Sequence, residues 1–294
     1  MAFNVAVFRT RALTALVFVA VMLTGLLWNF WSFFILFSII HFGCWIEYQK
    51  LIGKIDASYL EISKLHKYGV MIAGWCLMLF FTGSNYKIGN ISLQEIGYWS
   101  GLFFWFALPV IEIIITRKPN FKNTGYSILG LLYISLSWAL LTNLRSRFDA
   151  GEFFGDFVGK MYVILIIASI WINDTMAYIV GSFIGRTPLT KISPKKTWEG
   201  TVGGIILAIL VMCSIAYFSN KETEWDTIIQ VAMIAAIASI VGTFGDLLES
   251  KLKRMSDVKD SGHIMPGHGG FLDRFDSLLL ATPFVWTFVI LFLK

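Results

Sequence analysis

Long apolar stretches, separated by short polar clusters, run along almost the whole chain. Most stretches are close to the length of about 17–25 residues that an α-helix needs to cross a bilayer, and the charged residues gather between them. This pattern predicts an all-α, polytopic integral membrane protein with about nine transmembrane helices. Dividing the sequence at the polar clusters places these helices at about 12–27, 30–49, 69–84, 97–116, 125–144, 158–184, 202–219, 228–249 and 276–293.

The first two predicted helices follow each other closely. After Arg9 and Arg11 the apolar sequence continues to Ile46, far beyond the roughly 7–15 residues of a signal-peptide core. We therefore expect the N-terminal segment to be retained as a tight helical hairpin that turns near Asn29.

The basic residues are distributed unequally between the two ends of the predicted helices. Of the 24 Lys and Arg residues, 18 lie in the N-terminus and in the loops around 50–68, 117–124, 185–201 and 250–275. Because positively charged loops stay in the cytoplasm, we expect these segments to face the cytoplasm and the C-terminus to lie on the opposite side. The predicted location is the cytoplasmic membrane, and any active site formed by these loops is predicted to face the cytoplasm.

The composition agrees with a membrane protein and limits the kinds of molecule that the protein is expected to bind. The chain is 56% hydrophobic and 15% charged, whereas soluble domains average roughly 45–50% and 25%, so soluble, disordered and coiled-coil classes are excluded. The net charge of +5 resides on Lys and Arg that flank apolar spans, which favours membrane lipids and anionic substrates over nucleic acid. Cys44, Cys76 and Cys213 lie in separate apolar stretches and are predicted to be packing residues.

The candidate chemistry lies in the C-terminal region, 158–294, with its cytoplasmic loops 185–201 and 250–275; region 1–157 is predicted to contribute about five transmembrane helices. Asp174 lies within the sixth apolar stretch, where a carboxylate needs a cation or a proton to be tolerated. We interpret it as a metal or substrate residue. The alternative is a hydrogen-bonded structural aspartate.

The loop after this span combines a predicted helix start with basic residues. Ser193 is predicted to be the N-cap of the next helix, with Pro194 at its first position. The free N–H groups and positive dipole end of such a helix favour anions, and Lys195 and Lys196 add two charges there. The alternative is that these lysines only mark the cytoplasmic side or anchor lipid headgroups.

A predicted helical face leads into the last polar segment. Asp246, Glu249, Ser250 and Lys253 are spaced i, i+3, i+4 and i+7, so they share one face of a helix. That face is acidic within the membrane and basic at its edge. This order suits a metal ion followed by phosphate groups.

A glycine-rich loop follows, with four glycines within residues 262–270. Glycines permit backbone N–H groups to approach phosphate oxygens closely, and Asp273 and Asp276 come next, at the start of the last helix. Carboxylates with lysines and glycines are typical of a site where a divalent ion holds a triphosphate. His263 and His268 lack the further ligands that zinc takes; an ordinary surface loop is the remaining alternative.

Together these motifs resemble the phosphatidate cytidylyltransferases, also called CDP-diacylglycerol synthases. The stretches 174–178 (D-T-x-A-Y) and 193–200 (S-P-K-K-T-W-E-G) match upstream elements of that family, and Met265 stands where Leu, Ile or Phe is usual. The resemblance covers about residues 170–280. The C-terminal signature of the family is matched by Ser250, Leu252, Lys253, Arg254, Lys259, Asp260, Gly262, Pro266, His268, Gly269, Gly270, Phe271, Asp273, Arg274, Phe275 and Asp276.

The resemblance implies a metal-dependent nucleotidyltransferase of phospholipid biosynthesis, which converts CTP and phosphatidate to CDP-diacylglycerol and pyrophosphate. It implies Mg²⁺ as cofactor, allows a second, monovalent cation, and suggests a homodimer. Asp246 and Asp273 are the leading metal ligands, with Asp174 and Asp276 second. Besides these acids, the implied catalytic residues are Lys253, Arg254, Lys259 and Arg274, and the implied substrate-binding residues are Ser193, Lys195, Lys196, Ser250, His268, Gly269 and Gly270.

Three alternatives remain open. A related enzyme acting with CTP on another phosphorylated lipid and a CTP-dependent lipid kinase would need similar residues. An ion-coupled transporter also places acids in helices, but it has no need of the Gly-His-Gly-Gly loop at 267–270. Formation of pyrophosphate from CTP only when phosphatidate is present would separate all of them from the favoured reaction.

Overall fold

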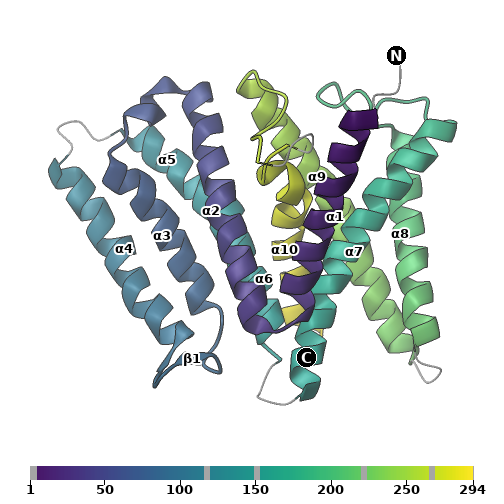
Figure 1. Ribbon diagram of the computed structural model, residues 1–294, viewed down its shortest axis with the longest axis horizontal. Helices are drawn as coiled ribbons and strands as arrows, with labels where there is room; N and C mark the ends of the chain where they lie inside the picture. The colour runs from purple at the N-terminus through teal and green to yellow at the C-terminus, as the bar shows by residue number, and fades with distance from the viewer. Residues whose placement is uncertain (1–4, 116–119, 149–152, 220–223, 265–268, 294) are drawn as a thin grey trace. The chain divides into compact units, whose positions relative to one another are not determined.

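The structure, a computed structural model, describes residues 5–115, 120–148, 153–219, 224–264 and 269–293. In these ranges the only strands are β1 (Lys87–Ile88) and β2 (Ile91–Ser92), which pair antiparallel. The predicted all-α class is confirmed (Figure 1). The helices are α1 (Val5–Leu27), α2 (Phe30–Ile55), the 3₁₀ turn η1 (Ala57–Glu61), α3 (Lys64–Phe80), α4 (Leu93–Ile115), α5 (Phe121–Gly130), the π turn η2 (Leu131–Leu136), α6 (Ser137–Ser146), α7 (Phe153–Ile184), α8 (Trp198–Ser219), α9 (Trp225–Met255) and α10 (Leu272–Phe292).

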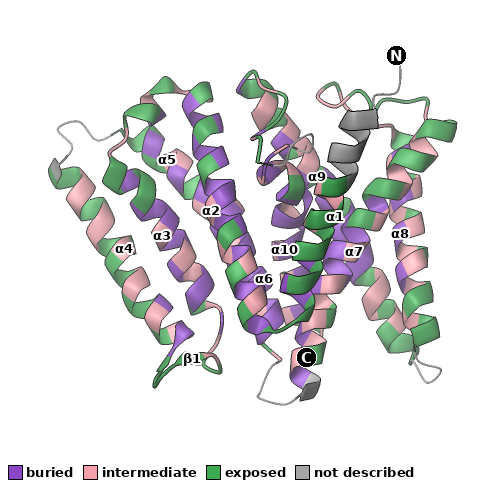
Figure 2. Cartoon of the chain, in the orientation of Figure 1, coloured by how far each residue is buried: buried purple, intermediate pink, exposed green. Residues whose placement is uncertain are grey.

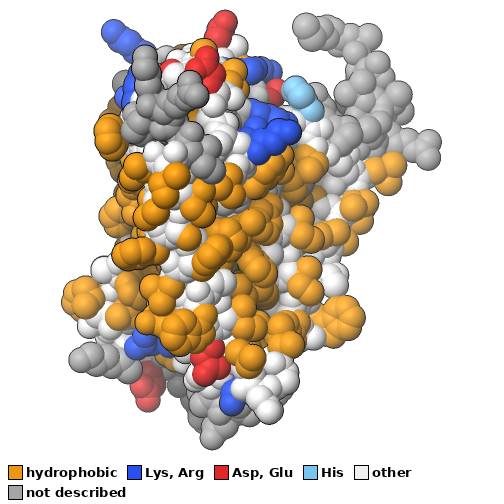
Figure 3. Space-filling model, turned by 90° about the vertical axis from the view of Figure 1, so that its left-hand side faces the viewer, with side chains coloured by type: hydrophobic (Ala, Val, Ile, Leu, Met, Phe, Trp, Pro, Cys, Tyr) orange, Lys and Arg blue, Asp and Glu red, His pale blue; other side chains and the backbone are white. Residues whose placement is uncertain are grey.

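Seven helical segments among the described residues are long and apolar enough to cross a membrane. The part of α1 whose side chains the structure describes, Leu13–Leu27, and the 17-residue α3 fall below that length, so the count of nine spans stays a prediction. Figure 3 shows hydrophobic side chains in a broad band over one face of the molecule, with charged side chains above and below it. The protein is therefore a polytopic membrane protein.

The helices divide into two compact units. Unit 1 comprises Met1–Lys160 and Met255–Arg274, and unit 2 comprises Met161–Arg254 and Phe275–Lys294. The helices α7, α9 and α10 each contribute to both units. The polar segment after α9 thus belongs to the same compact unit as the N-terminal helices. The functional division into 1–157 and 158–294 stays a prediction.

The predicted N-terminal hairpin is present in unit 1 as α1 and α2. Asn29 is the N-cap of α2: its side chain accepts a hydrogen bond from Ser32 N at 2.9 Å, and Ser32 Oγ accepts one from Asn29 N at 3.1 Å. This reciprocal capping box satisfies backbone donors that the start of a helix leaves open. The turn near Asn29 is confirmed.

Buried polar groups join the helices of unit 1 in addition to apolar packing. Trp45 Nε1 donates to Ser135 Oγ at 2.8 Å, and His41 Nε2 lies 3.0 Å from the same oxygen. Ser135 lies in η2, so the span predicted at 125–144 is one long helical segment, Phe121–Ser146, with a π turn in its middle. Figure 2 shows the buried residues along α2 and α3.

Segments predicted to face the cytoplasm meet at one end of unit 1. Lys122 Nζ forms an ion pair with Asp56 Oδ2 at 2.7 Å, and Ser256 Oγ donates to the Leu51 carbonyl oxygen at 3.2 Å. The hydrogen bonds from Lys122 and Ser58 lower the pKa of Asp56 to about 2. Three loops that the charge pattern groups together are therefore neighbours in space.

Small residues let the helices of unit 2 approach closely. A Cβ atom added to Gly204 of α8 would lie 2.8 Å from the Cβ of Ala177 in α7, and one added to Gly245 of α9 would lie 2.5 Å from the Asp276 carbonyl oxygen in α10. Packing through small residues is typical of membrane helices. Since Gly245 precedes Asp246, this contact sets the height of Asp246 along α10.

Candidate active site

The basic loop between α7 and α8 forms a short hairpin in unit 2. Leu189 N donates to the Lys196 carbonyl oxygen at 2.7 Å, and Trp198 N donates to the Thr187 carbonyl oxygen at 2.9 Å. At the tip, Lys196 N donates to the Ser193 carbonyl oxygen at 3.1 Å. Backbone groups on both sides of the loop are therefore paired across it before α8 begins.

The predicted helix start at Ser193 is wrong. The helix α8 begins at Trp198, and Thr197 Oγ accepts a hydrogen bond from Gly200 N at 3.1 Å, which is the contact of an N-cap. Ser193 and Pro194 instead lie at the tip of the hairpin, because the pairing across the loop fixes the residues on either side. The lysines of the loop thus precede the helix start instead of following it.

Glu199, in the first turn of α8, holds the base of this hairpin. Its carboxylate accepts hydrogen bonds from Arg186 N at 3.2 Å, Thr187 N at 3.2 Å and Thr187 Oγ at 2.9 Å. Glu199 was not among the predicted site residues, although it belongs to the matched 193–200 motif. Its contacts position the hairpin that carries the two adjacent lysines.

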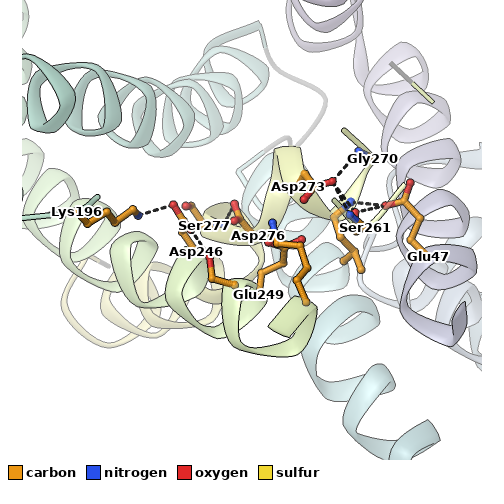
Figure 4. A network of polar contacts seen from close by, with 12 residues as sticks. Glu47, Lys196, Asp246, Glu249, Ser261, Gly270, Asp273, Asp276 and Ser277 are labelled. Atoms are coloured by element: carbon orange, nitrogen blue, oxygen red, sulfur yellow. Dashed lines mark hydrogen bonds and ion pairs between the residues drawn. The ribbon is translucent and has the colours of Figure 1, made fainter. Parts of the chain in front are cut away.

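A lysine of the hairpin reaches a carboxylate of α9. Lys196 Nζ forms an ion pair with Asp246 Oδ2 (Figure 4). Ser250 Oγ, one turn further along α9, donates to Asp246 Oδ1 at 3.2 Å. Both partners of the ion pair keep 29% of their side-chain surface exposed, so they remain accessible to a ligand. The structure therefore brings Lys196 of the basic loop to Asp246 and Ser250 of the predicted helical face. Lys195, which directly precedes Lys196, is exposed.

Asp174 of α7 and Asp276 of α10 belong to the same unit as Asp246. Asp174 is exposed, whereas Asp276 is buried. Asp276 Oδ1 also accepts a hydrogen bond from Ser277 N at 2.6 Å. Three of the four predicted metal ligands are thus collected in unit 2. Within the described ranges, no three Asp, Glu, His or Cys side chains already surround a common metal position.

The polar face predicted along 246–253 lies on one helix, because α9 continues to Met255. Glu249 is fully buried and forms an ion pair with Lys253. Lys253, predicted to contact phosphate, is therefore held by an acid of its own helix, whereas Arg254 is exposed. The phosphate-binding role of both basic residues stays a prediction.

Asp273 lies in unit 1, where it organises the polar segment before α10. Its Oδ2 accepts hydrogen bonds from Ser261 N at 2.9 Å, Ser261 Oγ at 2.9 Å and Gly270 N at 2.8 Å (Figure 4). Because one oxygen of Asp273 accepts three hydrogen bonds, it links Ser261, in the middle of this segment, to Gly270, near its C-terminal end. Its assignment as a metal ligand stays a prediction.

Glu47 of α2 is a residue that the sequence analysis missed. Its buried carboxylate accepts hydrogen bonds from Ser261 Oγ at 2.8 Å, and from Phe271 N and Leu272 N at 2.9 Å each. The signal was present in the sequence, since an acid within a membrane span is usually functional or paired. Glu47 connects the N-terminal helices to the segment that carries the family signature.

Two signature glycines pack against Glu47. A Cβ atom added to Gly262 would lie 2.2 Å from Glu47 Oε1, and one added to Gly270 would lie 2.3 Å from both carboxylate oxygens. The glycines of this loop were predicted to permit the close approach of phosphate oxygens. At these two positions, the close approach in the structure is to a carboxylate of the protein itself.

The remaining predicted site residues are spread over the same segment. Gly269 has a φ of 82°, a conformation that glycine adopts without strain. Lys259 is exposed, and Arg274 is exposed in the first turn of α10. His268 lies outside the described residues.

Comparison with known proteins places these features in a family. The chain matches the model of the cytidylyltransferase family over residues 9–292. It is 34% identical over 219 residues to the phosphatidate cytidylyltransferase of Bacillus subtilis, covering 74% of this chain and 76% of that protein. It is 44% identical over 219 residues to the protein of that name from Synechocystis sp., covering 74% and 68%. The family match includes the N-terminal helices, where the sequence analysis found no motif. The chain belongs to the cytidylyltransferase family.

Proposed function

We propose that the protein is a phosphatidate cytidylyltransferase, which transfers the cytidylyl group of CTP to phosphatidate and releases pyrophosphate. The relatives that bear this name support the substrate pair. The observation in the structure that supports the proposal best is the meeting of Lys196, Asp246 and Ser250, where a basic hairpin contacts an acidic helix face.

The reaction exchanges one phosphorus–oxygen bond for another. A phosphate oxygen of phosphatidate attacks the α-phosphorus of CTP; the bond from that phosphorus to the bridging α–β oxygen breaks, and its electron pair leaves with pyrophosphate. Because a phosphate monoester is already anionic, the step requires charge neutralisation and alignment more than a strong base. Lys195, Lys196 and Arg254 are suited to this role by their charge and their partial or full exposure.

Mg²⁺ is proposed to bind at Asp246, with Asp174 and Asp276 as further ligands. Mg²⁺ prefers oxygen ligands and commonly takes only one or two carboxylates, completing its shell with water and substrate phosphates. Asp246 together with either Asp174 or Asp276 would meet that requirement, and the ion pair with Lys196 supports the proposal that a cation binds at Asp246. Bound there, the ion would neutralise charge on the phosphoryl groups. Asp273 and a monovalent cation stay predictions.

The orientation in the membrane is part of the proposal. We propose that the active site faces the cytoplasm at the cytoplasmic membrane, because Lys195 and Lys196 lie in loop 185–201, one of the basic loops predicted to be cytoplasmic. The homodimer suggested by the resemblance stays a prediction.

The proposed reaction is tested with the full chain purified in detergent. Incubation with Mg²⁺, dioleoyl phosphatidate and CTP labelled at the α-phosphorus should give labelled CDP-diacylglycerol and an equal amount of pyrophosphate. CDP as the product would identify a lipid kinase instead. Product formed only with a different phosphorylated lipid would identify another substrate, and no product with any of them would overturn the proposal.

A further inference from the structure

A cavity of about 900 Å³ lies wholly within unit 1, between the C-terminal half of α2 and the segment 258–264. This volume is within the range of roughly 300–1,000 Å³ typical of small-molecule sites. Lys196, Asp246 and the other site residues of unit 2 do not line it. Its lining combines the C-terminal half of α2 with Lys259, Asp260 and Gly262 of the family signature.

Lysines line the cavity from two directions. Lys50 and Lys54 are four residues apart on α2 and so share one helical face, while Lys259 lies in the segment opposite. All three are exposed, and none forms a salt bridge within the described part of the chain. Their charges are thus available to an anion that enters the cavity.

Two acids, Glu47 and Asp260, also line the cavity, but the Glu47 carboxylate already has hydrogen-bond partners within the protein. Glu47 accepts three hydrogen bonds from the segment it holds, as described above. Asp260 is exposed, and the three lysines outnumber it. A phosphate monoester carries about −1.5 to −2 charges at neutral pH. The charge of the cavity therefore favours such a dianion over a second cation.

Apolar side chains complete the lining. Ile46, Leu60 and Ile264 are 46%, 67% and 55% exposed and lie around the cavity together with Phe271. A free phosphate ion gains nothing from such a lining, whereas the glycerol backbone and first methylenes of a lipid bury apolar surface against it. The cavity also lies near the C-terminal end of α2, a membrane-spanning helix, and so at the depth of lipid headgroups.

We propose that this cavity binds the phosphate monoester headgroup of a lipid, with Lys50, Lys54 and Lys259 contacting the phosphate. The inference rests on the proposed function, in which phosphatidate is the lipid of this class. It assigns a role in substrate recognition to two lysines of the N-terminal helices, which lie outside all of the motifs matched in the sequence.

The test compares two double variants of the full chain. Lys50→Gln with Lys54→Gln removes two charges from the cavity, and Lys64→Gln with Lys67→Gln removes two exposed charges of α3 that do not line it. Binding of dioleoyl phosphatidate and of dioleoyl phosphatidylcholine is counted by native mass spectrometry in detergent, without CTP. Affinity for phosphatidate should fall about fivefold for each lysine removed from the cavity. The α3 variant should bind as the wild type does.

A charge-restoring variant, a competing ligand and steady-state kinetics complete the test. Replacing Lys50 and Lys54 by Arg should restore binding, because the charge returns. Equal binding by the cavity variant and the wild type, equal loss of both lipids, or displacement of the lipid by an equimolar amount of inorganic phosphate would each overturn the inference. In steady-state assays the cavity variant should raise the KM for phosphatidate and leave the KM for CTP unchanged. Because binding is measured without turnover, a wild-type protein that binds phosphatidate through these lysines but makes no CDP-diacylglycerol would refute only the proposed function.

Discussion

Glu47 and Ser261 lie 214 positions apart in the sequence, and Ser261 Oγ donates a hydrogen bond to the Glu47 carboxylate at 2.8 Å. The same carboxylate accepts hydrogen bonds from the backbone of Phe271 and Leu272. One acid of α2 therefore contacts the polar segment between α9 and α10 at Ser261 and again where that segment joins α10. The N-terminal helices thus help to shape the candidate site as well as anchoring the chain.

Replacing Glu47 by Gln should loosen this segment. A glutamine amide has a single acceptor oxygen and places an NH₂ group against donors, and each buried donor left unsatisfied costs about 1–3 kcal/mol. We expect a lower melting temperature in detergent, faster proteolysis within 259–264, and at least a tenfold loss of activity. Glu61→Gln, at an exposed acid of the same unit, serves as the control. Proteolysis at the wild-type rate would show that Glu47 does not hold the segment.

The contact between Gly270 and Glu47 leads to a second prediction. Gly270→Ala would bring a methyl group to about the 2.3 Å separation from the Glu47 carboxylate oxygens and must displace one of them. We expect a destabilised protein with little activity. Gly125→Ala is the matched control, because a Cβ there meets nothing within 4 Å and Ala is favoured in a helix by up to about 1 kcal/mol. If both variants melt alike, the contact with Glu47 is unimportant.

The two leading metal candidates should behave differently. Asp246→Asn keeps the shape of the side chain but removes a negative charge beside Lys196, so we expect activity to fall by orders of magnitude and the remaining activity to need more Mg²⁺. Asp273→Asn weakens the acceptor for Ser261 and Gly270, so we expect a lower melting temperature and faster proteolysis of the segment.

Titrations of activity against Mg²⁺, run beside melting curves, separate these effects. An Asp246→Asn variant with normal turnover at saturating Mg²⁺ would mean that Asp246 is not a ligand. An Asp273→Asn variant that melts normally but needs far more Mg²⁺ would instead make Asp273 a ligand.

Local patterns predicted the fold well, and long-range contacts explain what they missed. The turn at Asn29 and the polar face of α9 each depend on residues within a few positions of one another, so sequence spacing was sufficient. The helix start at Ser193 was wrong because hydrogen bonds across the hairpin override the capping preference of Ser-Pro. The role of Glu47 was missed because its partners are more than 200 positions away.

Membrane orientation gives a further prediction. In a background without Cys44, Cys76 and Cys213, a cysteine at Asn90 should react with an impermeant maleimide applied to intact cells, whereas one at Glu61 should react only after lysis. Both positions are exposed, so accessibility of the side chain does not limit the reaction. Labelling of Glu61→Cys in intact cells would invert the topology predicted from the basic residues.

The two adjacent lysines of the hairpin should have separable roles. Lys195 is exposed, so Lys195→Ala should mainly raise the KM for CTP, as loss of a contact made equally in the ground and transition states does. Lys196 is paired with Asp246, and an ammonium at that carboxylate competes with a metal ion. Lys196→Ala should therefore lower the Mg²⁺ concentration for half-maximal activity, while turnover falls because a phosphate contact is lost. Lys191→Ala, at an exposed lysine of the same hairpin, is the control. Identical changes in the KM for CTP and in the Mg²⁺ requirement for both variants would mean that the lysines form one phosphate-binding cluster, with no competition at Asp246.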